Sequence, residues 1–300
     1  MKANHSRQNI FAVLAALIWG TAFVAQSVGA EYVEPFTFNA SRSAIATVVL
    51  FALCSLLRCR RVKTGQPATT GSRRDLTVSG FCCGAALTVA TALQQKGLET
   101  TSSGKAGFIT ALYIVLVPIA GLLLKKKPPK AIWLSVLLAV VGLYFLCITE
   151  DFTITRGDFY VLLCAFCFTA HILIIDHFTQ KVDGIELSCV QFFVMTVLSA
   201  IGMLLTETPS VEAVMACMGP ILYVGIFSSG VAYTLQILAQ KDSDPTVISV
   251  LLSLESVFAV IAGAIILGDQ MSVKEYLGCA LVMVAVLLAQ LPDKKAVSAQ

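Results

Sequence analysis

Long apolar stretches alternate with short polar connectors along the whole chain of 300 residues. Each stretch holds about 20 residues, the length that an α-helix needs to cross a hydrocarbon core of about 30 Å. Helix is expected, because backbone groups in lipid must be hydrogen-bonded within the segment and the period-two alternation of a transmembrane barrel is absent. The pattern predicts an all-α polytopic membrane protein with ten transmembrane helices, over residues 9–29, 35–57, 76–97, 104–124, 131–148, 157–178, 185–205, 213–238, 245–267 and 272–291.

The composition supports this fold class. Hydrophobic residues make up 57% of the chain and charged residues 13%, against about 45–50% and about 25% in soluble domains. Ten spans leave only short connectors, so no soluble catalytic domain is expected. The net charge is only +3 and the basic residues are scattered among connectors, which argues against a nucleic-acid partner.

The first apolar run allows a second interpretation. Lys2 and Arg7 precede it and it ends in Val28-Gly29-Ala30, as a cleavable secretory signal ends in small residues. The run is longer than the usual core of a signal peptide, and it carries Trp19 and Gln26. These features favour a retained first helix.

The basic residues predict the orientation in the membrane. With ten spans, 16 of the 21 Lys and Arg residues fall at the end of the molecule that holds the amino terminus, four at the other end, and Arg42 within a span. Cytoplasmic loops are rich in Lys and Arg. Both termini are therefore predicted to be cytoplasmic.

An internal repeat is suggested by a register shift of 142 residues. The shift places Leu93-Gln94 on Leu235-Gln236, Gly121 on Gly263, and Lys126-Lys127 on Gly268-Asp269. The shared plan is a Gln-bearing helix, a short polar connector, an apolar helix with a mid-span Gly and a last short helix. Because each half has five helices, the second half would enter the membrane upside down, as in transporters with inverted repeats.

Two motifs resemble those of a known family, the drug/metabolite transporter superfamily and its ten-helix EamA-type proteins. The run from Ala16 to Phe23 (ALIWGTAF) is similar to the opening-helix signature, and Arg42 falls where the second helix often has an arginine. Leu254-Glu255-Ser256-Val257-Phe258-Ala259 and the following Ile265–Asp269 segment are similar to the ninth-helix motif, with Asp269 in place of the more usual Glu.

The resemblance implies two EamA repeats, residues 9–148 and 157–291, in a bacterial inner membrane. It also implies a small-molecule substrate, with export or facilitated movement of amino acids, related metabolites or drugs. Import by a permease of the same fold stays open. The resemblance names neither a substrate nor an oligomeric state, and it implies no cofactor.

Two charged residues lie inside predicted spans. Arg42 is about 10 Å from one face of the bilayer and Glu255 about 15 Å from the other. In a hydrocarbon core of about 30 Å their depths therefore differ by only about 5 Å. A charge at the bilayer centre costs about 2.5–3.5 kcal/mol on the insertion scale, so each needs a partner or a wet cavity. Either the two groups have a structural role, or Arg42 binds a substrate carboxylate while Glu255 binds its amine or carries a proton.

Uncharged polar residues form stripes at helical spacing on two spans. The stripes are Gly80, Gly84, Thr88, Thr91 and Gln95 on the third, and Gly225, Ser229, Tyr233 and Gln236 on the eighth. Small residues indicate helix packing, whereas Thr91, Gln95, Tyr233 and Gln236 are predicted to line a substrate cavity. Trp19 is a further candidate for the cavity wall, because it lies in mid-span and away from the interface, and core packing is the alternative for it.

Two more residues are candidates for roles in the transport cycle. His171 titrates near neutral pH when it is accessible, so it is a candidate for proton coupling, although a buried neutral histidine is the commoner case. Pro118 removes a backbone hydrogen bond and frees the carbonyl of Ile114, which makes it a candidate hinge. Prolines are also common in static membrane helices.

Other functional classes have weaker support. An intramembrane serine hydrolase would have to use Ser228 or Ser229 with His171, but the Gly-x-Ser-x-Gly elbow and a third orienting group are missing. Cys164 and Cys167 have the spacing of a metal motif but lack a second ligand pair, so no metal site is expected. A channel would need a repeated polar ring, and no Walker-type phosphate loop is present for ATP coupling. A gradient-driven or facilitative carrier with alternating access is the favoured function, with proton coupling left open.

Overall fold

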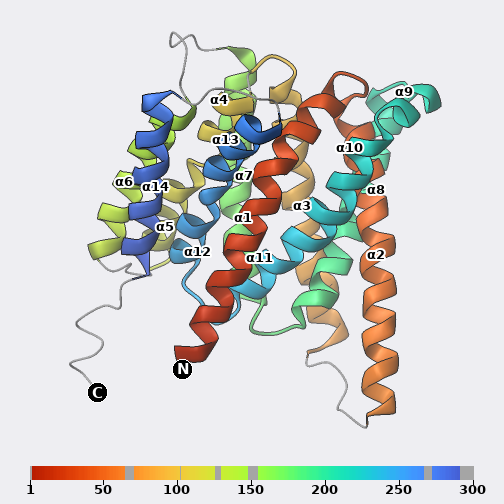
Figure 1. Ribbon diagram of the computed structural model, residues 1–300. Helices are drawn as coiled ribbons and strands as arrows, with labels where there is room; N and C mark the ends of the chain where they lie inside the picture. The colour runs from red at the N-terminus through yellow and green to blue at the C-terminus, as the bar shows by residue number, and fades with distance from the viewer. Residues whose placement is uncertain are drawn as a thin grey trace.

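The computed structural model describes residues 2–64, 71–101, 103–125, 130–147, 155–266 and 272–290. In these ranges all regular structure is helical, and the long helices cross the molecule in alternating directions as one bundle (Figure 1). The predicted span ends at 148, 267 and 291 and the repeat register at Lys126-Lys127 and Gly268-Asp269 lie outside the described residues.

The helices follow the predicted spans, and three of the spans are divided into shorter helices. They are α1 (Lys2–Ala30), α2 (Pro35–Lys63), α3 (Arg73–Leu98), α4 (Ser103–Thr110), α5 (Tyr113–Leu123), α6 (Lys130–Cys147), α7 (Arg156–Phe178), α8 (Gly184–Thr206), α9 (Val211–Ala216), α10 (Met218–Tyr223), η1 (Val224–Ala232, a π-helix), α11 (Tyr233–Gln240), α12 (Pro245–Leu252), α13 (Leu254–Ile266) and α14 (Val273–Ala289).

Local sequence explains where several helices begin. Pro35 and Pro245 lie in the first turns of α2 and α12, where the missing N–H of proline costs no hydrogen bond. Thr155 caps α7 and Ser272 caps α14, each in a reciprocal capping box with the acidic residue three positions later. These caps satisfy amide groups that a helix end leaves without partners.

The described helices are those of an integral, multi-pass membrane protein. Eight helical segments of the described chain are long and apolar enough to cross a membrane: 6–30, 35–63, 73–98, 105–123, 156–178, 184–206, 218–240 and 245–262. The apolar segment Ile132–Leu146 of α6 is shorter, and α14 has 17 residues. The count of ten spans therefore stays a prediction for α6 and α14.

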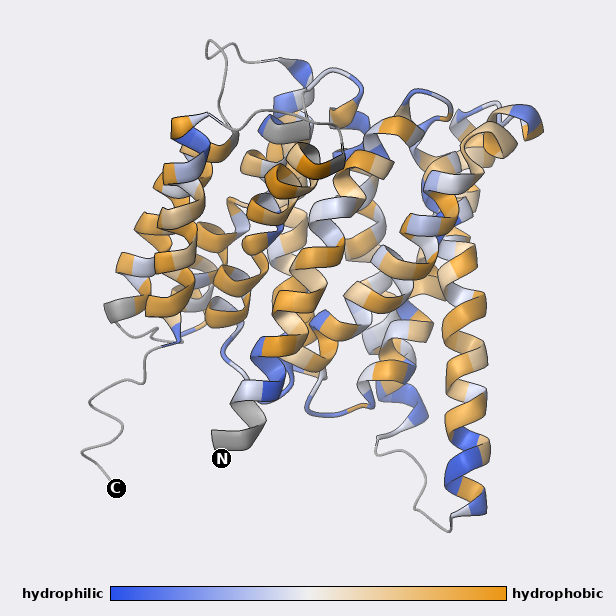
Figure 2. Cartoon of the chain, in the orientation of Figure 1, coloured by the Kyte–Doolittle hydropathy of each residue, from blue (hydrophilic) through white to orange (hydrophobic). Residues whose placement is uncertain are grey.

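The surface separates into apolar flanks and a charged end. Large apolar side chains such as Val48, Phe51 and Leu56 are exposed on α2, as expected of a helix that faces lipid. Hydrophilic residues gather at the lower end of α2, on the side of the molecule where α1 begins (Figure 2).

The two halves of the chain interlock. The most extensive helix pairs are α6 with α14, α3 with α7, α2 with α8, α3 with α8 and α1 with α13, and each joins a helix of the first half to one of the second. The largest cluster of buried apolar residues draws on both halves, from Ala12 to Ala289. The core, and any cavity in it, therefore belongs to both halves together.

Candidate functional site

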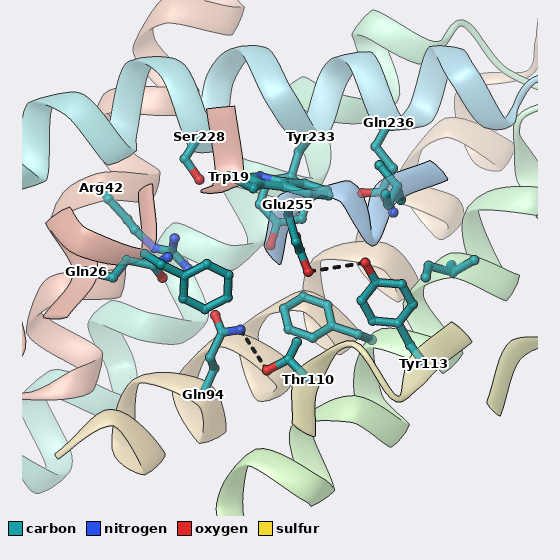
Figure 3. A pocket seen from close by; sticks show the side chains of 14 residues that line it. Trp19, Gln26, Arg42, Gln94, Thr110, Tyr113, Ser228, Tyr233, Gln236 and Glu255 are labelled. Atoms are coloured by element: carbon teal, nitrogen blue, oxygen red, sulfur yellow. Dashed lines mark hydrogen bonds between the residues drawn. The ribbon is translucent and has the colours of Figure 1, made fainter. Parts of the chain in front are cut away.

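A narrow cavity lies at the centre of the bundle, between the two halves (Figure 3). The centres of water molecules can occupy about 40 Å³ of it, which is room for a few waters only. The cavity is lined by Trp19, Phe23, Gln26, Arg42, Gln94, Thr110, Tyr113, Phe168, Ile172, Ser228, Tyr233, Gln236, Leu252 and Glu255. A substrate larger than a few waters requires the surrounding helices to separate.

Two interrupted helices bring polar groups to this cavity. The first breaks at Ala111-Leu112, between α4 and α5, where Leu112 N–H donates to the Ile109 carbonyl at 3.2 Å. The second breaks at Ser253, between α12 and α13, where Ser256 N–H donates to the Ser253 carbonyl at 3.2 Å. These tighter bonds replace the regular helical pattern. Broken helices are tolerated at membrane depth where they line a cavity.

The residues that follow the two breaks meet each other. Tyr113 is the first residue of α5, Glu255 is the second of α13, and the Tyr113 hydroxyl donates a hydrogen bond to Glu255 Oε1 at 3.2 Å (Figure 3). Both side chains are buried, with 4% and 5% exposed. The contact therefore joins the halves of the chain at the cavity.

The cavity lining repeats in the sequence. Eight of the 14 lining residues form pairs that are 142 positions apart: Gln26 and Phe168, Gln94 and Gln236, Thr110 and Leu252, and Tyr113 and Glu255. This separation equals the register shift suggested by the sequence. Residues that this register pairs thus converge on one cavity.

Arg42 and Glu255 both face the cavity, but they are not paired with each other (Figure 3). The Arg42 Nε donates to Asn39 Oδ1 at 2.9 Å, and its guanidinium carbon lies 6.0 Å from the centre of the Phe38 ring. Among the described residues no ion pair involves either group. The cavity therefore presents one basic and one acidic side chain, and neither takes part in an ion pair within the described residues.

Aromatic rings form one wall of the cavity. The rings of Trp19 and Tyr233 meet edge to face, with centroids 4.7 Å apart, which is a favoured geometry for aromatic pairs. Trp19 Nε1 and Gln236 Oε1 are buried without a hydrogen-bond partner in the described chain. Buried polar groups are normally hydrogen-bonded, so both atoms fit groups that a bound molecule or water would satisfy.

Comparison with known proteins assigns the fold to a family. The sequence model of the EamA-like transporter family matches residues 7–148 and again residues 155–291. The chain belongs to the EamA-like transporter family. It is a membrane transporter and not an enzyme, with a small molecule as substrate and the lipid bilayer as its surroundings.

Relatives of this EamA-like transporter cover almost the whole chain. An uncharacterized transporter of Archaeoglobus fulgidus is 33% identical over 282 residues, which are 93% of this chain and 84% of that protein. The uncharacterized transporter YwfM of Bacillus subtilis is 25% identical over 305 residues, 97% of this chain and 96% of its own. A crystal structure with 19% identity matches with a TM-score of 0.78, over 97% of this chain and 99% of that one, which shows the shared fold.

The structure brings some of the predicted site residues of the EamA-like transporter to the cavity. Trp19, Arg42, Tyr233, Gln236 and Glu255 line it. Sequence reasoning missed Gln94, Thr110, Tyr113 and Ser228. The signal for Gln94 was present in the sequence, since the register of 142 aligns it with Gln236.

Thr91 and Gln95 lie outside the cavity lining. The Thr91 hydroxyl donates to the Leu87 carbonyl at 2.8 Å, and Gln95 Nε2 donates to the Gln26 carbonyl at 3.0 Å. On the same stripe, a Cβ at Gly84 would lie 2.6 Å from the Gln191 carbonyl oxygen of α8. The stripe therefore faces α8 at its glycines and α1 at Gln95.

His171 lies behind the cavity wall. Its Nε2 is 3.1 Å from Gln191 Oε1 and its ring meets Tyr233 edge to face, with centroids 6.0 Å apart. The residue is fully buried, and Nδ1 has no partner in the described chain. His171 thus reaches the cavity through Tyr233 and not directly.

Pro118 lies within α5, five residues after the first residue of that helix. The helix break is at Ala111-Leu112 and therefore precedes Ile114, whose carbonyl the proline frees. Pro118 is buried and does not line the cavity.

The possible metal ligands of the described residues do not form a cluster. They contain no group of three or more His, Cys, Asp or Glu side chains that could hold a metal ion. Cys164 and Cys167 are free thiols on α7. The cavity lining itself has one carboxylate and no thiol.

Proposed function

We propose that this chain is a secondary carrier that exports small zwitterionic metabolites, such as amino acids or related compounds, by alternating access. The observation that carries the proposal is the pair of buried, mutually unpaired charges on the cavity wall, Arg42 and Glu255. A carboxylate on Arg42 and an amine on Glu255 would neutralise both groups at once. The aromatic wall would accept the apolar remainder of the substrate.

The proposed architecture is two inverted five-helix repeats, residues 9–148 and 157–291, with ten spans. An inverted repeat places the substrate near the midplane, between discontinuous helices. The two helix breaks support this arrangement, because Ala111 and Ser253 are separated by the same 142 positions as the suggested repeat. In the proposed cycle, one bundle moves against the other and the cavity widens toward one side at a time.

The proposed orientation has both termini in the cytoplasm of the cell and the protein in the plasma membrane. The distribution of arginines supports this orientation. The end of α2 and the start of α3 carry most of them, and arginines are enriched on the cytoplasmic side of membrane proteins. Glu255 is the first candidate for proton coupling because it faces the cavity, and His171 is the second because it contacts Tyr233.

Flux in proteoliposomes tests the proposed substrate class. Purified protein is offered labelled amino acids, the matching amines that lack the carboxylate, and the matching acids that lack the amine, with and without a pH gradient. We expect the wild type to prefer the zwitterion, and Arg42→Gln to transport the amine and the zwitterion about equally. Glu255→Gln should lose the preference for the zwitterion over the acid.

Arg60→Gln is the matched control, because it removes an exposed arginine from the same helix as Arg42. It should behave as the wild type. Wild-type preferences in both Arg42→Gln and Glu255→Gln would leave the two charges a structural role only. Metabolite profiling of cells with and without the protein then gives the net direction of transport.

A further inference from the structure

A second cavity lies apart from the central one and shares none of its lining residues. It opens between the last turns of α2, the first turn of α3 and the turn that leads into α8, and its volume is about 710 Å³. We call it the arginine cleft, after Arg58, Arg61 and Arg73, which line it. None of its residues takes part in the proposed transport site.

The turn before α3 shapes this cleft. Gly71 has a φ of +123°, a conformation that favours glycine. A Cβ at this position would lie 2.5 Å from the Lys181 carbonyl oxygen. The chain therefore packs closely against the turn between α7 and α8 before Arg73 begins α3.

The charges of the cleft are only partly paired. Arg61 Nη2 is 3.3 Å from Asp183 Oδ2, while Asp183 Oδ1 accepts hydrogen bonds from the Ile185 and Glu186 amides at the start of α8. Asp183 is thus engaged on both of its oxygens. For Arg58 and Arg73 the described chain contains no ion pair. The second carboxylate of the lining is Glu186.

The cleft lies where the apolar surface of the molecule ends. On α2 the basic residues begin at Arg58, and Val62 is the one large apolar side chain of this helix that is exposed beyond Leu56 (Figure 2). Leu57, Val62 and Leu76 line the cleft beside the arginines. Such a boundary between apolar and basic surface is typical of the depth at which a membrane protein meets the phosphates of a bilayer.

We propose that the arginine cleft binds a phosphate ester, with Arg58 and Arg73 as the groups that contact it. An arginine offers a planar fork of donors that fits phosphate oxygens. Basic pockets between transmembrane helices bind anionic lipid headgroups on the same physical basis. The apolar side chains of the cleft suit the first carbons of an acyl chain, and a soluble phosphate ester would use the arginines alone.

Native mass spectrometry of the full chain in a non-ionic detergent tests the proposal. The probes are phosphatidylglycerol, phosphatidylcholine and glycerol 3-phosphate. The variant is R58Q/R73Q, and the matched control is R60Q/R74Q, which removes two exposed arginines outside the cleft. We expect one phosphatidylglycerol to bind to the wild type and the control, and to bind about thirtyfold more weakly to R58Q/R73Q, at the usual contribution of a basic residue near an anionic lipid.

The arms of the experiment separate the two sources of phosphate. Binding of phosphatidylglycerol that glycerol 3-phosphate does not displace supports a lipid, and displacement at equal concentration supports a soluble ester. Equal weakening in R58Q/R73Q and R60Q/R74Q would overturn the proposal, because diffuse surface charge would then explain the binding. Unchanged binding of phosphatidylglycerol and of glycerol 3-phosphate in R58Q/R73Q would overturn it too, because these two arginines would then not hold the phosphate, while phosphatidylcholine shows how far a cationic headgroup weakens binding of the same phosphate. Thermal melting in phosphatidylcholine confirms that both double variants fold.

Discussion

The two interrupted helices have the same design but carry different chemistry. Each breaks beside the cavity, α4–α5 at Ala111-Leu112 and α12–α13 at Ser253, and each presents a polar side chain within two residues after the break. In the first half this residue is Tyr113, a neutral donor, and in the second half it is Glu255, an acid. A repeated backbone feature thus positions two groups that only one hydrogen bond connects. The position of the break thus repeats between the two halves, while the chemistry of the residue beside it does not.

The surroundings of the two interrupted helices differ as well. α13 packs so closely on α1 that a Cβ at Gly20 would lie 2.6 Å from the Glu255 carbonyl oxygen and 2.8 Å from the Ala259 amide nitrogen. On α4, a Cβ at Gly107 would meet no atom within 4 Å. The acid therefore lies on a helix that is held tightly against α1, whereas α4, which precedes the tyrosine, has open space at Gly107.

The chemical difference predicts unequal losses of transport. Glu255→Gln removes the one acidic group that the described residues bring to the cavity lining, and we expect transport to fall more than about a hundredfold, as for a charge that contacts the substrate. Tyr113→Phe removes one hydrogen bond to a carboxylate and should cost about tenfold. Initial rates of substrate exchange in proteoliposomes measure both. Equal losses would show that the Tyr113–Glu255 hydrogen bond, and not the acid itself, is what the cavity requires.

The packing difference predicts opposite effects of alanine at two glycines. Gly20→Ala forces backbone atoms of α1 and α13 apart, so we expect a loss of about 2 kcal/mol of stability, typical of overpacking. Gly107→Ala has free space and a helical backbone, so it should be neutral or stabilise by up to about 1 kcal/mol. Thermal unfolding in detergent compares the two. A destabilised Gly107→Ala would contradict the looser packing of α4.

The pair Gln94 and Gln236 predicts a smaller asymmetry. Gln94 Nε2 already donates to Thr110 Oγ1 at 3.3 Å, whereas Gln236 Oε1 has no partner in the described chain. Gln236→Leu should therefore raise the substrate KM about fivefold, the value of one hydrogen bond, and Gln94→Leu about twofold. Transport at varied substrate concentration gives both values. A larger effect at Gln94 would reverse the assignment of the substrate-binding side.

Most of the fold follows from hydropathy and from turn residues. The apolar stretches predict the helix ranges, and Pro35 and Pro245 mark helix starts because proline suits the first turn. Neither helix break has a proline or glycine at the break itself: Ala111-Leu112 and Ser253 are ordinary residues for a helix. The interruptions depend on tertiary contacts around the cavity, which the pattern along the chain does not record.

The residues that line the cavity were harder to predict, because the side chains that face it depend on how each helix is rotated about its own axis. Gln94 and Gln95 are adjacent, yet one lines the cavity and the other bonds to α1, since successive helical residues point about 100° apart. The stripe that contains Gln95 has glycines that pack on α8, as small residues often do. In the other half, the π-helix Val224–Ala232 changes the spacing, so Ser228 lines the cavity instead of the Ser229 of the regular stripe. Arg42 and Glu255 were easier to predict as site residues, because a charged side chain inside a membrane span needs a partner or a water-filled cavity.

Substitution of Pro118 is expected to have the smallest effect on the transport rate. It separates the role of the proline from the role of the helix break at Ala111-Leu112. The register of 142 aligns it with Val260 of α13, so Pro118→Val gives the first half the residue of the second. If the break at Ala111-Leu112 already provides the flexible point, the proline adds only a local deformation, and transport should slow by about twofold with KM unchanged. A loss above tenfold, in protein that melts at the wild-type temperature, would instead make Pro118 the hinge. Val260→Ala serves as the control in the second half, and no change in rate is expected from it, because Val260 does not line the cavity.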